Sequence, residues 1–217
     1  MSYAPIVPAI IPTSREEVIK FSQLLNFSKE IQLDLVDGKF VQAVCWPYEP
    51  IGEPLSVKSF LDGYTLEIDL MVEEPIKAAN EWIVAGADMV VFHIETLPLE
   101  VFKNFVTGTD VSVGASAHGD TTLETLITYC EYADYIQLMG IKEVGAQGQP
   151  FDETVIDKII ALKKLFPYKS ITIDGSVNKN TIEKLRKAGA DRFIVGSAIV
   201  QQTNPEAAYK ELGQLVI

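Results

Sequence analysis

Two short turns late in the chain combine the residue types that bind anions through the backbone. Residues 174–176 follow one β-branched apolar run, and residues 196–197 follow the next. Because these residues carry little beyond Cβ, their N–H groups can converge on an oxyanion, and a helix N-terminus after each turn would add partial positive charge. We therefore expect a phosphate site formed by Gly175, Ser176, Gly196 and Ser197.

Three aspartates, Asp34, Asp69 and Asp174, lie within or at the ends of apolar runs. An unpaired charge in such surroundings is unfavourable, so a cation, shared protons or a lysine must compensate it. No lysine lies inside these runs, which favours a metal ion or protonation. One or two of the aspartates could instead orient loops as hydrogen-bond partners. A metal-binding or catalytic carboxylate cluster is the favoured interpretation.

Eight apolar runs alternate with amphipathic segments whose apolar residues recur at helical spacing. The runs are continuously apolar, as in parallel strands buried on both faces. The predicted strands are residues 6–11, 31–35, 66–71, 89–93, 111–115, 135–139, 170–173 and 192–195. Eight strand–helix units in 217 residues predict an α/β fold in which residues 1–217 form a single (β/α)8 TIM barrel domain. A flavodoxin-like open sheet is the alternative, but it needs fewer strands.

The ends of several helices are also marked in the sequence. Ser14, followed by Glu16 and Glu17, is typical of a helix N-cap with favourable charge in the first turn. Gly86 and Gly189 each follow an amphipathic segment and precede an apolar run by two residues. Both glycines are therefore predicted to take the left-handed conformation that ends a helix.

Composition limits the classes of partner. The chain is 47% hydrophobic and carries a formal net charge of −12, which argues against binding to nucleic acid or to an anionic membrane surface. Its two cysteines form no CxxC motif, and no secretory signal or membrane-length apolar run is present. We expect a cytoplasmic protein without disulfides that binds a small molecule.

A series of short motifs occurs in a fixed order: Gln32-Leu33-Asp34 with Asp37-Gly38, Asp69-Leu70-Met71-Val72, Phe92-His93-Ile94-Glu95, Gln137-Leu138-Met139, Gly148-Gln149, Ile173-Asp174-Gly175-Ser176 and Val195-Gly196-Ser197-Ala198. In this order and spacing the chain resembles the ribulose-phosphate 3-epimerase family over nearly its whole length. The resemblance implies a (β/α)8 barrel of the ribulose-phosphate-binding type.

The resemblance also implies a reaction, in which two aspartates on opposite faces of a ketose phosphate remove and return the proton at C3. A divalent metal held by two histidines and two aspartates polarises the carbonyl, and no organic cofactor takes part. Such isomerases serve carbohydrate metabolism in the pentose phosphate pathway. By position, Asp34 and Asp174 match the two acid/base aspartates. The implied phosphate grip includes Gly175, Ser176, Gly196, Ser197 and Gly148, and the implied substrate contacts are Met71, Met139 and Gln149.

The chain departs from the family pattern at the metal site. Gln32 and Asp69 stand where the two histidines are expected, and Ala9 stands where the family has a serine. An amide and a carboxylate are harder ligands than imidazoles. The set Gln32, Asp34, Asp69 and Asp174 would therefore suit Mg²⁺ or Mn²⁺ better than Zn²⁺ or Fe²⁺. The added negative charge should raise the pKa of any carboxylate that is not on the metal.

Two alternatives remain open. Hexulose-6-phosphate synthases and sugar-phosphate decarboxylases carry an Asp-x-Lys-x-x-Asp run on the third strand. Here Asp69 fits, but Met71 occupies the lysine position. The non-enzyme alternative is a catalytically degenerate homologue that keeps phosphate binding as a scaffold or sensor. Retention of both Asp34 and Asp174 argues against it.

The remaining polar and aromatic candidates are weaker. His93 could orient substrate or a loop, but the favoured interpretation is a partly buried side chain bonded to a backbone carbonyl or to Glu95. His118 could face the barrel mouth and replace a lost imidazole, or be a solvated loop residue. Trp46 could cover the site or pack against a partner subunit, and it makes a homo-oligomer plausible. Cys45 has no neighbouring base and is expected to be packed.

Overall fold

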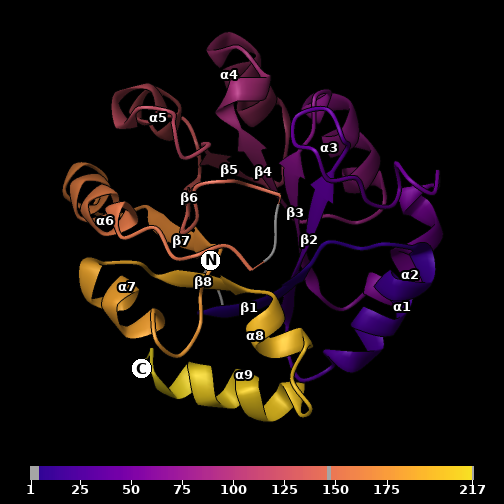
Figure 1. Ribbon diagram of the computed structural model, residues 1–217. Helices are drawn as coiled ribbons and strands as arrows, with labels where there is room; N and C mark the ends of the chain where they lie inside the picture. Colours follow the sequence, from indigo (N-terminus) through magenta and orange to yellow (C-terminus); the bar gives the residue numbers. More distant parts are fainter. Residues whose placement is uncertain (1–4, 146–147, 217) are drawn as a thin grey trace.

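Eight parallel strands close into a barrel in strict chain order, with helices forming an outer ring (Figure 1). This arrangement is seen in a computed structural model that describes residues 5–145 and 148–216. The strands are β1 (Ile6–Ile10), β2 (Glu30–Val36), β3 (Thr65–Met71), β4 (Met89–His93), β5 (Ser112–Ser116), β6 (Tyr135–Met139), β7 (Ser170–Asp174) and β8 (Arg192–Val195). Parallel pairing of β1 with β8 closes the cylinder, so the fold is the predicted TIM barrel and not an open sheet.

The helices are α1 (Arg15–Leu24), α2 (Lys58–Leu61), α3 (Pro75–Val84), α4 (Leu99–Gly108), α5 (Leu123–Cys130), α6 (Thr154–Leu165), α7 (Ile182–Ala188), α8 (Ser197–Val200) and α9 (Pro205–Gln214), with 3₁₀ turns η1 (Pro54–Val57) and η2 (Ile94–Thr96). Helices α1 to α7 lie between successive strands, and α8 and α9 follow the last strand, β8. Ser14 caps α1 by accepting a hydrogen bond from the Glu17 N–H. Gly86 and Gly189 have φ angles of 106° and 114°, as predicted. Among the described residues, no helix has both the length and the apolar character required to cross a membrane.

Side chains alternate between the two faces of each strand, and the two faces differ in kind. The outward face of the strands packs apolar side chains such as Leu33, Leu70 and Ile173 against the helices. The inward face is mostly polar. Its polar residues that are at least 91% buried are Glu30, Gln32, Glu67, Asp69, His93, Ser112, Ser116, Gln137, Thr172, Asp174 and Arg192. Burial on both faces, predicted from apolar runs, is thus confirmed, but the barrel interior is not an apolar core.

A buried ionic cluster links the strands toward their N-terminal ends. The Arg192 guanidinium lies 2.5 Å from a carboxylate oxygen of Glu67 and 3.2 Å from one of Glu30. The Tyr135 hydroxyl donates to the other Glu67 oxygen at 2.6 Å. Gly114 makes room for this tyrosine, because a Cβ at that position would lie 2.6 Å from the ring. These contacts join β2, β3, β6 and β8 across the barrel, and they leave the C-terminal half of the interior to the candidate site.

Candidate active site

A pocket of about 260 Å³ opens at the C-terminal ends of the strands. It gathers residues that are far apart in the sequence, because parallel strands all end at this rim of the barrel. Of the predicted site residues, those that line it are Asp34, Met71, Met139, Gly148, Gln149, Asp174, Gly175, Ser176, Gly196 and Ser197. Only Gln32 and Asp69 lie outside the lining, since they sit deeper in the interior.

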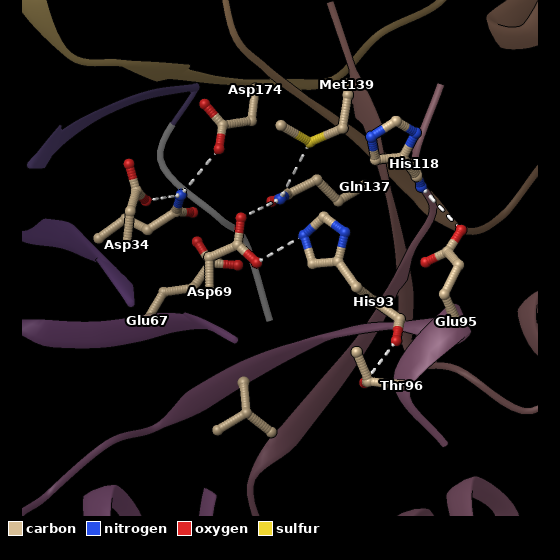
Figure 2. A network of polar contacts seen from close by, with 12 residues as sticks. Asp34, Glu67, Asp69, His93, Glu95, Thr96, His118, Gln137, Met139 and Asp174 are labelled. Atoms are coloured by element: carbon tan, nitrogen blue, oxygen red, sulfur yellow. Dashed lines mark hydrogen bonds and ion pairs between the residues drawn. The ribbon is translucent and has the colours of Figure 1, made fainter. Parts of the chain in front are cut away.

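The three predicted aspartates form one cluster (Figure 2). Asp34 and Asp69 are paired in register on β2 and β3, and Asp174 ends β7. One carboxylate oxygen from each lies within 4.8 Å of the others. Asp69 has no solvent exposure, and Asp174 is 9% exposed. Closure of the barrel therefore brings together acids that are separated by up to 140 positions in the chain.

Gln32 bridges the two acids that line the pocket. Its Nε2 group donates to Asp34 at 2.8 Å and to Asp174 at 3.2 Å. Its Oε1 atom is buried and has no hydrogen-bond partner. Because the amide can present either atom, a half-turn of the side chain would direct this free oxygen toward the carboxylates. Three carboxylates and one amide oxygen form an all-oxygen donor set, which fits a hard divalent cation.

Asp69 is held by two other side chains. Gln137 Nε2 donates to one carboxylate oxygen at 2.8 Å, and His93 Nε2 lies 3.1 Å from the other (Figure 2). The prediction that His93 bonds to a backbone carbonyl or to Glu95 is wrong, because its ring points into the barrel toward β3. Sequence reasoning gave Gln137 no role. Residues two positions apart on a strand point to the same face, so Gln137 shares a face of β6 with Met139. This alternation is the sequence signal that could have identified Gln137 as a site residue.

His118 takes no part in the acid cluster. Its backbone N–H donates to Glu95 at 2.8 Å, in the loops that follow β4 and β5. The interpretation that His118 replaces a lost imidazole is therefore wrong, and the loop interpretation holds. Within the part of the chain that the structure describes, the grouped metal-ligating side chains are the three aspartates alone.

Crowding of buried acids shifts their ionisation. Burial, with the nearby charges of Asp174 and Asp69, raises the pKa of Asp34 well above its ordinary value. Burial and the Asp69 charge raise the pKa of Asp174 to about 7, although hydrogen bonds from Gln32 and Gly175 oppose the shift. For His93, burial alone would lower the pKa, but the Asp69 carboxylate raises it above the ordinary value. The upward direction predicted for these carboxylates is confirmed.

The two small-residue turns both line the pocket. Gly175 has φ of 92°, and Ser176 has φ of 53°, the one non-glycine residue with positive φ in the described ranges. The Ser176 hydroxyl donates to the Gln149 carbonyl, and its own carbonyl accepts from Asn178 and Thr181. A Cβ on Gly196 would meet only the Ala9 carbonyl at 3.5 Å. The space beside the Gly196 backbone is thus open, whereas Ile141 lies against Gly175.

The expectation that each turn opens a helix holds for the second turn only. Gly196 directly precedes α8, which has four residues. After the first turn, α7 begins only at Ile182, because Asn178 and Thr181 fold residues 176–181 into a hydrogen-bonded loop. The first turn therefore has no helix directly behind it. The loop after β6 includes residues 146 and 147, which lie outside the described residues.

The loop after β2 folds back onto its own strand. The Cys45 N–H donates to the Val36 carbonyl, and Trp46 packs edge-on against Trp82 with 5.9 Å between ring centroids. Trp46 is 2% exposed, so the prediction that it covers the site or contacts a partner subunit is wrong. Cys45 is packed as predicted, and burial raises its pKa to about 12. Phe40 is the aromatic residue of this loop that reaches the site, 5.5 Å from the His93 ring.

Comparison with known proteins identifies the family. Residues 4–200 match the model of the "Ribulose-phosphate 3 epimerase family". The chain belongs to this family. It is 30% identical over 215 residues to the ribulose-phosphate 3-epimerase of Mycobacterium bovis, covering 95% of this chain and 90% of the relative. The enzyme of the same name from Schizosaccharomyces pombe is 27% identical over 225 residues, covering 100% of this chain and 96% of the relative.

Solved structures share the barrel fold of this family member. A 3-hexulose-6-phosphate synthase superposes with a TM-score of 0.73 at 18% identity, covering 99% of this chain and 100% of the other. The 3-keto-L-gulonate-6-phosphate decarboxylase of Vibrio cholerae gives a TM-score of 0.72 at 15% identity, with 98% of both chains covered. At these identities the likeness concerns the fold alone.

Proposed function

We propose that this protein epimerises a ketose phosphate at C3 by proton transfer between two aspartates. The observation that carries the proposal is the pair Asp34 and Asp174, which line one pocket and share the Gln32 amide. A carbon between two carboxyl groups can lose a proton to one and regain it from the other on the opposite face. Family membership supports the same reaction.

The different pKa values of the two aspartates support different roles, one as general acid and the other as general base. Burial and the neighbouring charges of Asp174 and Asp69 raise the pKa of Asp34 well above its ordinary value, which favours the protonated form of this carboxyl. Asp174, with a pKa of about 7, is ionised in a large fraction of molecules and is poised to accept one. In one direction Asp174 removes the C3 proton while Asp34 donates to the other face. After turnover the protonation states are exchanged, which suits the reverse direction.

The phosphate of the substrate is proposed to lie at the two turns. Backbone N–H groups near Gly175 and Ser176, together with those near Gly196 and Ser197, surround this end of the pocket. Gly148 and Gln149 would close the site from the loop after β6, where the Gln149 carbonyl already contacts the Ser176 hydroxyl. Met71 and Met139 form apolar walls beside the reacting carbons.

We further propose that a divalent cation serves the acid cluster. Asp34, Asp69 and Asp174 would hold it, with Gln32 contributing its free Oε1 atom. Mg²⁺ or Mn²⁺ is favoured over Zn²⁺ or Fe²⁺, because the donor set is all oxygen. When bound, the cation would act as a Lewis acid that stabilises negative charge on the substrate oxygens. No organic cofactor is proposed.

The enzymatic alternative is less well supported by the pocket. Lysine-dependent decarboxylation or aldol chemistry requires an ammonium at the end of β3. Met71 occupies that position, lines the pocket and is 2% exposed. The non-enzyme alternative, a protein that only binds phosphate, does not explain why Asp34 and Asp174 lie close together. Proton transfer accounts for both ends of the pocket.

Solvent exchange at C3 tests the proposal. Asp34→Asn and Asp174→Asn should each abolish deuterium incorporation at C3 of D-ribulose 5-phosphate in D₂O, observed by NMR. Binding of inorganic phosphate should survive in both variants, because the turns are unchanged. Asp110→Asn, at an exposed aspartate outside the pocket, is the matched control. Normal exchange in both active-site variants would refute the two-aspartate mechanism.

We also propose that the chain acts as a single-domain, cytoplasmic enzyme of the pentose phosphate pathway and assembles as a homo-oligomer. Trp46 cannot support the assembly, since it is buried. Ile51, Leu55 and Val84 support it instead, because they are 93%, 54% and 66% exposed. Light scattering coupled to size-exclusion chromatography tests this, and a monomer at micromolar concentration would contradict it.

A further inference from the structure

Asp69 is the deepest member of the acid cluster and the most constrained. It has no solvent exposure, and each of its two carboxylate oxygens already faces one donor. The donors come from different strands on one side of the barrel, His93 from β4 and Gln137 from β6. A carboxylate held on both oxygens cannot rotate about its last torsion. Its remaining lone pairs therefore keep a constant direction.

The two donors are themselves held in place. Phe40 lies against the His93 ring with 5.5 Å between centroids, and the Gln137 amide contacts the Met139 sulfur at 4.0 Å. Both side chains have no solvent exposure, so they cannot exchange Asp69 for water. Through Met139 the arrangement also reaches the wall of the substrate pocket.

Each donor side chain keeps one buried polar atom without a hydrogen-bond partner. His93 Nδ1 and Gln137 Oε1 are buried and have no hydrogen-bond partner. Polar side chains whose only purpose is to stabilise the barrel normally satisfy all their buried atoms. These two side chains leave one atom each unpaired and direct the other at the same carboxylate. Such an arrangement favours orientation of Asp69 over general stabilisation.

We propose that His93 and Gln137 are positioning residues that hold the Asp69 carboxylate so that its free lone pairs face Asp34 and Asp174. The inference deepens the proposed function, because it gives Asp69 a fixed place in the site where substrate and cation would bind. Hydrogen bonds to a ligating carboxylate set its direction, and their removal typically weakens metal binding or activity by about 10- to 100-fold.

Imidazole NMR on the unmodified protein is the first test, and it needs neither activity nor a metal. The chain contains two histidines, so a His118→Gln spectrum assigns both rings. We expect the Nε2 nitrogen of His93 to carry a proton that exchanges slowly with solvent. A His93 ring with Nε2 unprotonated would overturn the proposal, because it could not donate to Asp69.

Variants at the two donors provide the second test. His93→Leu and Gln137→Leu should each lower Mn²⁺ affinity, measured by calorimetry, by about 10- to 100-fold, and lower kcat more than they raise KM. His93→Gln keeps an N–H donor and should recover much of the loss, whereas His118→Gln should match the unmodified protein. Inorganic phosphate affinity should not change, which separates positioning from unfolding.

The outcomes separate this proposal from the proposed function. Unchanged Mn²⁺ affinity and kcat in both leucine variants would overturn the positioning role even if epimerisation is confirmed. Equal losses in His93→Leu and His93→Gln would also overturn it, because the donated hydrogen bond would then be irrelevant. If the unmodified protein exchanges no C3 proton but the Mn²⁺ losses appear, the positioning role stands and epimerisation fails.

Discussion

Neutralising Asp174 should raise the free energy of unfolding at neutral and alkaline pH. The gain should become smaller as the pH falls and vanish in acid. The carboxyl is 9% exposed and close to two other acids, which raises its pKa to about 7. In the unfolded chain the same group titrates near its ordinary value of about 3.9. Between these two values the folded state binds more protons than the unfolded state, so the free energy of unfolding falls as pH rises. Asp174→Asn removes this dependence, and its amide oxygen can still accept from Gln32.

The size of the effect follows from the shift. About three pH units at roughly 1.4 kcal/mol each give an unfavourable contribution of about 4 kcal/mol at pH 8. By the same relation, the unfavourable contribution of the Asp174 carboxyl to stability is about 1.5 kcal/mol at pH 5 and almost zero at pH 3. The difference in unfolding free energy between Asp174→Asn and the unmodified protein should therefore widen by about 2–3 kcal/mol from pH 5 to pH 8.

Urea unfolding at both pH values, with EDTA present, measures this difference. EDTA is needed because a bound cation would stabilise the ionised carboxylates and reverse the trend. Asp110→Asn, at an exposed aspartate, should show no widening. A difference for Asp174→Asn that stays constant or narrows toward pH 8 would refute the argument that burial and neighbouring acids raise this pKa.

Three further predictions concern the interior and the acid cluster. Arg192→Met leaves Glu30 and Glu67 without their buried counter-ion and should lower the free energy of unfolding by about 3–5 kcal/mol in urea; a loss below about 1 kcal/mol would contradict the ion-cluster interpretation. Gly114→Ala places a methyl group 2.6 Å from the Tyr135 ring and should lower the free energy of unfolding in urea by about 1–3 kcal/mol; an unchanged free energy would contradict the close packing of the ring against this glycine. Mn²⁺ or Mg²⁺ should raise the Tm more than Zn²⁺ does, by about 2–4 °C per kcal/mol of binding, and Asp69→Asn should remove the increase.

The order of the elements could be read from the sequence because it depends on local periodicity. Apolar runs and amphipathic segments located all eight strands to within one residue at either end. The helix ends were also predictable, because they depend on few neighbours. The glycines end helices through their own backbone conformation, and the capping serine accepts a single hydrogen bond. The rim residues followed as well, since parallel strands place their C-terminal ends at one edge.

The residue types also identified both ends of the site. Turns of glycine and serine, and aspartates within apolar strands, are unusual enough to be recognised in the sequence. Gly175 and Gly196 meet in one pocket with Asp34 and Asp174, as the strand order required. The polar inner face of the barrel was not foreseen. Glu30, Glu67 and Arg192 each lie within or next to a predicted apolar strand. Their opposite charges come together only when β2, β3 and β8 close into a cylinder.

The sequence by itself determined the element order, the family and the carboxylates at the rim, since each of these depends on residue type and spacing along the chain. The tertiary structure alone decided which side chains meet inside the barrel. His93 and Gln137 reach Asp69 from 24 and 68 positions away, and Trp46 turns inward against Trp82. Such contacts depend on strand register and on the direction each side chain takes across a closed interior, which no local pattern encodes.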